Sequence, residues 1–163
     1  MSMIFLILPS FNEEKNLVKI FKKINNLLIV KNITVILIDD CSTDNTKNIK
    51  FKKNSFKIYY KKHVKNMGLS IALETGFNIA RKKVKRNDLI ITMDSDNTHP
   101  IKIIPRMIDL LKKNNSDIVI ASRFLPNSKV NGINFLRQCL SIVSKYVFSY
   151  LFPHENLKEY NCN

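Results

Sequence analysis

The 163-residue sequence contains no tryptophan, only three glycines and three cysteines, and no apolar run approaching the ~18 residues of a membrane-spanning helix. With 45% hydrophobic residues and five prolines, this composition excludes a collagen-like or low-complexity chain and indicates a single globular domain. The cysteines, Cys41, Cys139 and Cys162, are odd in number and widely spaced, so they offer neither a disulfide framework nor a zinc site. A reducing, cytoplasmic compartment is the simplest expectation.

Acidic residues are scarce: 13 Asp+Glu stand against 27 Lys+Arg, which gives a formal net charge of +14 at pH 7. Such a surplus attracts polyanions, a class that includes nucleic acids, anionic membranes and phosphorylated substrates. The lysines are spread over several expected helices, and no RNP, KH or zinc-finger signature accompanies them. A basic nucleic-acid-binding module is therefore the outside alternative, and nucleic acid is not the expected partner.

Apolar runs alternate with helical patterns along the chain, which is the order typical of a parallel α/β sheet. We expect strands at residues 3–8, 33–38, 56–60, 88–93 and 117–122. Helices are expected after an N-cap at Asn12, through 47–53, over 66–83, from Pro100 onward and over 135–152. His63 follows the third strand without any ligand spacing and is expected in solvent.

Three polar clusters follow expected strands, at residues 9–13, at Asp39-Asp40 and at Asp94-Ser95-Asp96. Because ligands of parallel sheets bind beyond the carboxyl ends of the strands, we expect these clusters to converge in one crevice. Asp94 and Asp96 are one residue apart and repel each other, so a metal ion, a basic partner or a shared proton is expected between them. A divalent cation held by few protein oxygens fits this spacing.

Taken alone, the pair of Asp94 and Asp96 is a weak signal, because carboxylates there also serve to cap the helix after Pro100. The same D-x-D-x-T pattern matches haloacid-dehalogenase-like phosphatases, but these need a later acidic pair for the metal. The later acids are not paired at any strand end: Asp109, Asp117, Glu155 and Glu159. Asp39 and Asp40 suit ribose hydroxyls or base N–H groups, although capping of the next helix explains some of that cluster.

Taken together, five segments resemble the motifs of the family 2 glycosyltransferases in order and spacing, over residues 4 to about 162. They read "ILPSFNEEKNL", "VILIDDCSTDNT", "NMGLSIALETGFNIA", "DLIITMDSDNTHPIKIIPRMI" and "DIVIASRF". The most similar branch is the polyprenyl-phosphate mannosyltransferase group. This resemblance implies a GT-A fold, that is, a Rossmann-like, mostly parallel sheet flanked by helices. It also implies one domain over 1–163, with 1–98 binding the nucleotide-sugar and 99–163 forming the acceptor side.

The resemblance also assigns roles to individual residues. The nucleotide of the donor would be held by Pro9, Phe11, Glu13, Ile38 and Asp40. Its diphosphate, with Mg²⁺ or Mn²⁺, would be held by Asp94, Ser95 and Asp96, with Thr98 near the metal. Arg123 would act beside Asp94 and Asp96 at the donor–acceptor junction, and Arg137 would bind the acceptor phosphate. Arginine suits that task because it is always charged and binds phosphate in a bidentate manner; for Arg137 a solvated surface position is the alternative.

The expected function is a metal-dependent, inverting transfer of a hexose to a polyprenyl or dolichyl phosphate at the cytoplasmic face of a membrane. Mannose from GDP-mannose is the first expectation for the donor, with UDP-glucose as an open alternative. The apolar tract 139–152 is expected either to lie on anionic lipid or to pack in a core. A transferase that binds nucleotide without turnover is a further alternative.

Two departures from the family pattern bear on this expectation. Cys41 stands where glycine is usual, and if that position requires a positive φ the cysteine costs about 1 kcal/mol or more. The final "KEYNCN" resembles the start of a D-Y-T-[CS]-G-F-R segment of the branch, with Glu159 in place of Asp. Because catalytic domains of the family continue past this point, we expect a domain that is truncated at its C-terminal end.

Overall fold

The computed structural model describes residues 2–49, 54–122 and 135–151; within the last range the side chains of 135–141 and 145 are not described. The chain divides into two compact units, Met1–Pro105 and Arg106–Asn163, which are described separately.

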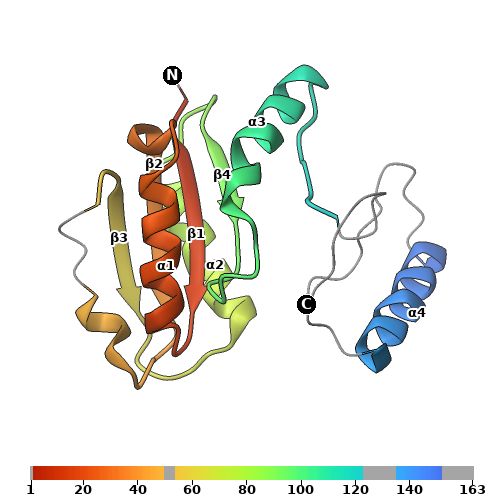
Figure 1. Cartoon of the computed structure of the whole chain (residues 1–163), viewed down its shortest axis with the longest axis horizontal. Helices are drawn as coiled ribbons and strands as arrows, with labels where there is room; N and C mark the ends of the chain where they lie inside the picture. Colours follow the sequence, from red (N-terminus) through yellow and green to blue (C-terminus); the bar gives the residue numbers. More distant parts are fainter. Residues whose placement is uncertain (1, 50–53, 123–134, 152–163) are drawn as a thin grey trace. The chain divides into compact units, whose positions relative to one another are not determined.

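The first unit is built on a four-stranded parallel sheet with the strand order β3-β2-β1-β4 (Figure 1). Its strands are β1 (Ile4–Ser10), β2 (Ile33–Asp39), β3 (Lys57–Lys62) and β4 (Leu89–Thr92). Every residue of β1 and β2 is buried, as their continuous apolar runs predict for strands covered on both faces. The register pairs Ile4 with Ile33 and Ser10 with Asp39, so these central strands end side by side.

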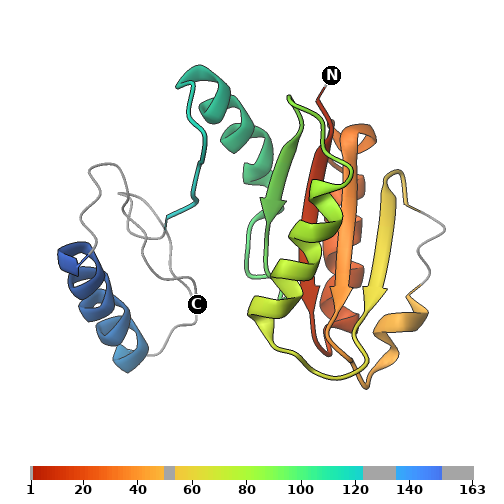
Figure 2. The ribbon, with the colours of Figure 1, turned by 180° about the vertical axis from the view of Figure 1, so that it is seen from behind.

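Two helices cover opposite faces of this sheet, α1 (Glu14–Asn25) in front in Figure 1 and α2 (Leu69–Arg81) in front in Figure 2. The inward side chains of α1 recur at helical spacing and are buried: Leu17, Ile20, Phe21 and Ile24. Each large apolar side chain buried in this way contributes roughly 1.5–3 kcal/mol. The inward face of α2 is made of small residues, Ala72, Gly76 and Ala80.

Gly76 sets how closely α2 approaches the sheet. A Cβ atom at this position would overlap Cγ2 of Ile7 on β1, and it would lie 3.6 Å from Cγ1 of Ile38 on β2. The side chains of Ile7 and Ile38 belong to the apolar core that α2 covers. This close contact holds the beginning of α2 near the carboxyl ends of β1 and β2, where the polar clusters lie.

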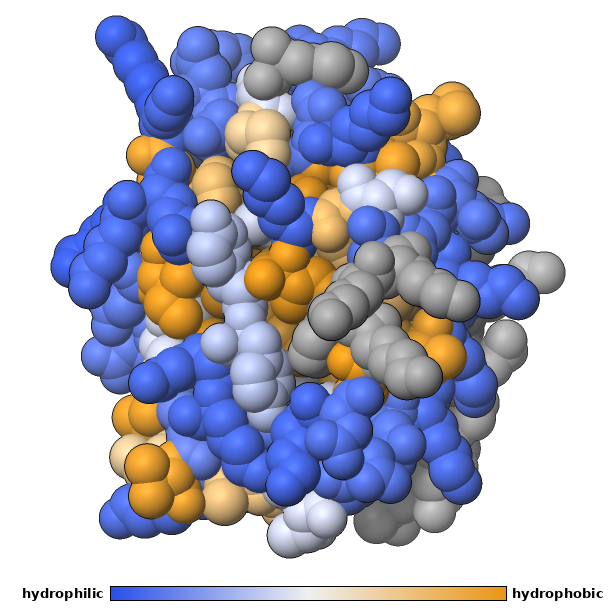
Figure 3. Space-filling model, turned by 90° about the vertical axis from the view of Figure 1, so that its left-hand side faces the viewer, coloured by the Kyte–Doolittle hydropathy of each residue, from blue (hydrophilic) through white to orange (hydrophobic). Residues whose placement is uncertain are grey.

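One edge of the sheet is formed by β3, which is amphipathic and largely exposed. Lys57 and Lys61 face solvent, and Nζ of Lys83 lies 4.0 Å from the centroid of the Tyr59 ring. Figure 3 faces this side and shows hydrophilic side chains around scattered apolar ones. Lysines on an edge strand discourage pairing with a second sheet.

Several predicted elements differ from those observed. The strand predicted at 117–122 is wrong: this segment forms no strand, and Ile118 is 76% exposed and Ile120 46% exposed. An apolar run becomes a strand only when a neighbouring edge pairs with it, and among the described residues the sheet ends at β4. In place of the helix predicted through 47–53, a 3-10 turn η2 covers Asn45–Asn48, and residues 50–53 lie outside the description.

The remaining elements follow the prediction closely. One element that was not predicted from the sequence, the 3-10 turn η1 (Val30–Asn32), precedes β2. Pro100 caps a 3-10 turn η4 (Ile101–Ile103) that leads into α3 (Ile104–Lys113), where Ile104 is buried. In the second unit, α4 covers Phe135–Leu151, within one residue of the predicted range. Across the described residues, no helix has the length and apolarity needed to cross a bilayer.

Candidate functional site

The three polar clusters predicted at the strand ends do come together at the carboxyl ends of the central strands. The backbone N–H of Asp40 donates a 2.8 Å hydrogen bond to the carbonyl of Ser10, which joins the ends of β1 and β2. The Ser95 hydroxyl donates a 2.7 Å hydrogen bond to the carbonyl of Pro9, which joins the segment after β4 to β1. The strand ends therefore meet as predicted, but the cavity found there is lined by residues of the first two clusters and not by Asp94, Ser95 or Asp96.

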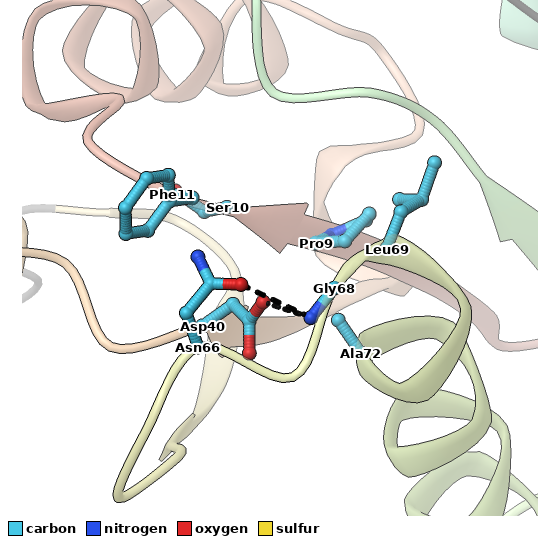
Figure 4. A pocket seen from close by; sticks show the side chains of 8 residues that line it. All are labelled: Pro9, Ser10, Phe11, Asp40, Asn66, Gly68, Leu69 and Ala72. Carbon is cyan, nitrogen blue, oxygen red and sulfur yellow. Dashed lines mark hydrogen bonds between the residues drawn. The ribbon is translucent and has the colours of Figure 1, made fainter.

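A cavity of about 220 Å³ opens at the carboxyl ends of the strands (Figure 4). It lies between the end of β1 and the beginning of α2, and its walls are Pro9, Ser10, Phe11, Asp40, Asn66, Gly68, Leu69 and Ala72. Three predicted nucleotide-binding residues, Pro9, Phe11 and Asp40, are among them. In Figure 4, the Phe11 ring stands apart from the Asp40 carboxylate and the Asn66 amide, both of which accept a hydrogen bond from Gly68 N.

The wall contributed by residues 66–72 was missed as a binding surface by the sequence analysis. The motif "NMGLSIA" could have indicated it, because a glycine, Gly68, stands between the polar Asn66 and the first turn of a helix. Gly68 has φ 84° and ψ 166°, a conformation that is essentially restricted to glycine. The chain can therefore turn at Gly68 and place its N–H group against Asp40.

The loop that carries Phe11 is fixed by contacts with the loop after β2. Asn12 has a φ of 57°, and its Oδ1 accepts hydrogen bonds from the backbone N–H groups of Thr43 and Asp44 at 2.8 and 3.3 Å. The prediction that Asn12 caps α1 is wrong, because the N-cap position is Glu13. The N–H of Glu14 is instead capped by Oδ2 of Asp44, at 3.0 Å.

Glu13, the next predicted nucleotide-binding residue, is half-buried at the start of α1. Its Oε2 accepts a 2.7 Å hydrogen bond from the Asn16 side chain, and its carbonyl accepts from Leu17 N. Glu13 does not line the cavity. Ile38 is fully buried, with its side chain in the core beneath α2, and it does not line the cavity.

Asp39 is fully buried and already has several partners. Its Oδ1 accepts from Ser42 N at 2.7 Å, its Oδ2 accepts from the Tyr60 hydroxyl at 2.5 Å, and Lys62 Nζ lies 3.9 Å from Oδ2. Burial and the neighbouring Asp39 carboxylate raise the pKa of Tyr60 above its usual value. This arrangement makes Asp39 a structural link between β2 and β3.

Asp40 has a different role, because it is a wall of the cavity. Its Oδ1 accepts hydrogen bonds from His63 Nδ1 at 2.7 Å and from Met67 N at 2.8 Å, and its Oδ2 accepts from Gly68 N at 2.7 Å. Burial by itself would raise the pKa of Asp40, but the hydrogen bonds from His63, Met67 and Gly68 outweigh it and hold this pKa below its usual value. The carboxylate is therefore ionised at neutral pH.

The prediction that His63 lies in solvent is also wrong. Its side chain is only 9% exposed and is paired with Asp40, instead of lying in solvent. Its second ring nitrogen, Nε2, lies 3.0 Å from Oγ1 of Thr75 on α2. Nothing in the local sequence indicates this contact, because Asp40 and Thr75 are 23 and 12 residues away.

The segment predicted to bind a metal forms a tight turn after β4. Asp94 is half-buried, Asp96 and Thr98 are exposed, and Ser95 is 3% exposed. Oδ1 of Asp96 accepts from the backbone N–H and the hydroxyl of Thr98, at 2.9 and 2.8 Å. Asn97 has a φ of 64°, and its Oδ1 accepts a 2.6 Å hydrogen bond from Lys23 Nζ at the end of α1.

This donor set fits a hard divalent cation that is shared with a substrate. Asp94, Asp96 and Thr98 would offer oxygen ligands to such a cation, because Mg²⁺ is commonly bound through one or two carboxylates together with waters and phosphates. The described residues contain no group of three or more His, Cys, Asp or Glu side chains arranged for a metal. A cation here would therefore need oxygen atoms from a ligand to complete its coordination.

The predicted acceptor-side arginines are not placed. Arg123 lies outside the described residues, and Arg137 belongs to α4, but its side chain is not described. Position 41 does adopt a positive φ, 67° at Cys41, as expected of a site where glycine is usual.

Comparison with known proteins places these motifs in a family. The family model for glycosyl transferase family 2 matches residues 5–159. A dolichol-phosphate mannosyltransferase of Pyrococcus furiosus is 34% identical over 137 residues, which cover 83% of this chain and 37% of that protein. An uncharacterized protein of Methanocaldococcus jannaschii is 30% identical over 151 residues, covering 90% of this chain and 64% of that protein. The chain thus spans less than two thirds of the length of either relative.

Among solved structures, residues 1–349 of TarS from S. aureus superpose with a TM-score of 0.55 at 20% identity, over 83% of this chain and 42% of that chain. A second TarS structure gives a TM-score of 0.51 at 23% identity, over 80% of this chain and 24% of that chain. These likenesses concern the fold, and they confirm the predicted GT-A type with its mostly parallel sheet flanked by helices.

Proposed function

The chain belongs to glycosyl transferase family 2, and on that premise we propose that it transfers a hexose from a nucleotide-diphospho-sugar to a polyprenyl phosphate. The proposal rests on one observation, which is that two neighbouring sites are connected. The first is the cavity lined by Phe11 and Asp40, and the second is the turn that carries Asp94 and Asp96. The hydrogen bond from the Ser95 hydroxyl to the Pro9 carbonyl connects them. The similarity to a dolichol-phosphate mannosyltransferase supports GDP-mannose as the first donor to test.

The cavity receives the nucleoside. At about 220 Å³ it is smaller than the ~300–1,000 Å³ of pockets that enclose a whole drug-sized ligand, so it accommodates only a portion of the donor. Phe11, 47% exposed, offers a ring for stacking, and Asp40 accepts a hydrogen bond from a base N–H or a ribose hydroxyl. Pro9, Glu13 and the main chain of Ile38 complete the proposed nucleotide contacts.

The diphosphate extends from the cavity past Pro9 toward Asp94, Ser95 and Asp96. Mg²⁺ or Mn²⁺ bound there, with Thr98 nearby, would neutralise charge on the departing nucleoside diphosphate. The buried Ser95 keeps the turn in register with the cavity because its hydroxyl is bonded to the carbonyl of Pro9. Asp96 is oriented by its two hydrogen bonds from Thr98.

Residues 1–98 are proposed to bind the nucleotide-sugar, and residues 99–163 are proposed to bind the acceptor. Arg123 and Arg137 are proposed to hold the acceptor phosphate, which is already anionic and needs little help from a general base. The exposed apolar residues of α4 and the net charge of +14 support peripheral attachment to an anionic membrane surface at its cytoplasmic face. These residues are Ile142, Val143, Tyr146, Val147, Phe148, Tyr150 and Leu151.

Calorimetry of the full chain with GDP and with UDP, each with and without Mg²⁺ or Mn²⁺, tests the proposal. We expect metal-dependent binding that is lost in Asp94→Ala and in Asp96→Ala. The control is Asp109→Ala, an exposed carboxylate on α3, which should bind as the wild type does. Binding without metal dependence, or binding that is unchanged in both variants, would contradict the proposal.

The preference between the two nucleotides separates GDP-mannose from a uridine donor such as UDP-glucose. Turnover is tested by transfer of labelled hexose from the preferred donor to a polyprenyl phosphate, which is then extracted into organic solvent. A chain that binds donor and metal but gives no labelled lipid is a nucleotide-binding transferase without turnover.

A further inference from the structure

We propose that His63 is a positioning residue of the nucleotide site, which fixes the orientation of the Asp40 carboxylate by joining it to Thr75 of α2. The inference rests on the proposed function, because it concerns how Asp40 is prepared to bind the nucleoside. It assigns a role to a side chain that lies behind the cavity wall and would not itself contact the ligand.

His63 is held at three points. Its backbone N–H donates a 2.8 Å hydrogen bond to the carbonyl of Asp39, its Nδ1 lies 2.7 Å from Oδ1 of Asp40, and its Nε2 lies 3.0 Å from Oγ1 of Thr75. These contacts reach β2 and α2 from the end of β3. An imidazole fixed at both nitrogens leaves the Asp40 side chain little freedom to change its rotamer.

The number of bonds at Asp40 identifies the atom that remains available to a ligand. An ionised carboxylate offers about four acceptor positions, two on each oxygen. Oδ1 uses two, for His63 and Met67, whereas Oδ2 uses one, for Gly68. Among the described residues nothing else bonds to Oδ2, so this oxygen keeps one acceptor position for a base N–H or a ribose hydroxyl.

The contact with Asp40 determines which ring nitrogen of His63 carries a hydrogen. An ionised Asp40 can only accept, so Nδ1 carries a hydrogen and donates it. The Thr75 hydroxyl can rotate either to donate to Nε2 or to accept from it, so neutral and charged imidazole both fit. His63 pairs with the Asp40 carboxylate, and Lys62 Nζ lies 3.9 Å from Oδ2 of the adjacent Asp39. The positioning role therefore requires a donor at the Nδ1 position and not a particular charge on the ring.

Two conservative substitutions separate this role from simple packing. In His63→Asn the side-chain amide nitrogen can replace Nδ1 and donate to Asp40, while the link to Thr75 is lost. In His63→Gln the amide reaches the position of Nε2, so the link to Thr75 can be kept while the donor to Asp40 is lost. The two variants thus retain opposite halves of the bridge.

The experiment measures the Kd of GDP and of UDP, with Mg²⁺ or Mn²⁺, by calorimetry well below the unfolding temperature of each variant. We expect His63→Ala and His63→Gln to raise the Kd about tenfold, and His63→Asn to remain within about threefold of the wild type. Thr75→Val should give an intermediate increase. Val64→Ala, at a fully exposed neighbouring position, serves as the control and should leave the Kd unchanged.

A double-mutant cycle shows whether His63 acts through Asp40. In an Asp40→Ala background the further substitution His63→Ala should alter the Kd less than twofold, because the carboxylate that His63 would position is already absent. An unchanged Kd in folded His63→Ala, or equal losses in the Asn and Gln variants, would overturn the positioning role and leave the proposed function intact. Absence of any nucleotide binding by the wild type would overturn both.

Discussion

The Ser95 hydroxyl donates a 2.7 Å hydrogen bond to the carbonyl of Pro9, a residue 86 positions earlier in the chain. Ser95 is 3% exposed, and Pro9 is a wall of the cavity at the end of β1. One buried hydroxyl therefore connects the proposed nucleoside pocket to the carboxylates at Asp94 and Asp96. This bond gives the two halves of the donor site a fixed relationship.

Removing this hydroxyl should reduce stability and donor binding together. Ser95→Ala deprives the Pro9 carbonyl of a donor inside the fold, at an expected cost of about 1–3 kcal/mol in the free energy of unfolding. The Kd for the nucleotide-sugar should rise as well, because the turn loses its register with the cavity. Urea denaturation and donor titration measure the two effects, with Ser70→Ala, at an exposed position on α2, as the control. A Kd equal to that of the wild type would show that the bond is structural only.

Phe11 should contribute more to binding than to stability. Its ring is 47% exposed at the mouth of the cavity, so Phe11→Ala should change the free energy of unfolding by less than about 1 kcal/mol. Stacking of a base on an aromatic ring is worth about 1–3 kcal/mol, which predicts a Kd for nucleotide about tenfold higher or more. Phe11→Tyr keeps a ring and should bind as the wild type does. Equal nucleotide affinity of the Ala and Tyr variants would remove Phe11 from the site.

Cys41 and Gly68 both have a positive φ, so we expect exchanges between glycine and a larger residue at these positions to change the free energy of unfolding in opposite directions. Cys41 has a φ of 67°, and its thiol makes only a 3.4 Å contact with the carbonyl of Val64. Cys41→Gly should therefore raise the free energy of unfolding by up to about 1 kcal/mol. Gly68→Ala should lower it by about 1–3 kcal/mol, although beyond the adjoining residues no described atom lies within 4 Å of the added Cβ. Thermal and urea unfolding measure both changes, and a destabilised Cys41→Gly would contradict the strain argument.

Stability should fall in acid because of Asp40 and Asp44. For Asp44, burial alone would raise the pKa, but hydrogen bonds from Thr46 and from the N–H of Glu14 lower it below the ordinary value of 3.8. A carboxylate with a depressed folded-state pKa stabilises the fold fully above the unfolded pKa and loses that contribution as pH falls through the folded value. Urea denaturation should show this loss beginning below about pH 5 and continuing past pH 3.8.

The variant Asp44→Asn provides the check on this pH dependence. It should be less stable than the wild type at pH 7, where the charged cap is missing, and the difference should narrow toward pH 3. Asp109→Asn, at an exposed position on α3, is the control and should follow the wild type. A difference between Asp44→Asn and the wild type that is constant with pH would contradict the assignment.

The features of this structure that the sequence predicts are those set by local pattern. The apolar runs of β1 and β2 and the helical spacing in α1 depend on residues close together in the chain. The rule that ligands bind at the carboxyl ends of parallel strands then predicted the meeting of Ser10, Asp40 and Ser95 without any contact being known.

The features that were missed depend on residues far apart in the sequence. Asn12 is not the cap of α1, because Asp44, 30 residues from Glu14, supplies the hydrogen bond. His63 became buried because Asp40 and Thr75 lie on either side of it in the fold. The apolar run at 117–122 forms no strand, since local propensity does not provide a partner edge.

The most direct test of the account is an NMR titration of the full chain with nucleotide and then with Mn²⁺, which broadens the signals of nearby nuclei. We predict that GDP or UDP shifts the amide signals of Phe11, Asp40 and Gly68, and that Mn²⁺ then broadens those of residues 94–98 and of the neighbouring Ser10. The broadening should be absent in the Asp94→Ala, Asp96→Ala double variant. Nucleotide shifts outside the cavity, or Mn²⁺ broadening that spares residues 94–98, would contradict a donor site at the joined ends of β1, β2 and β4.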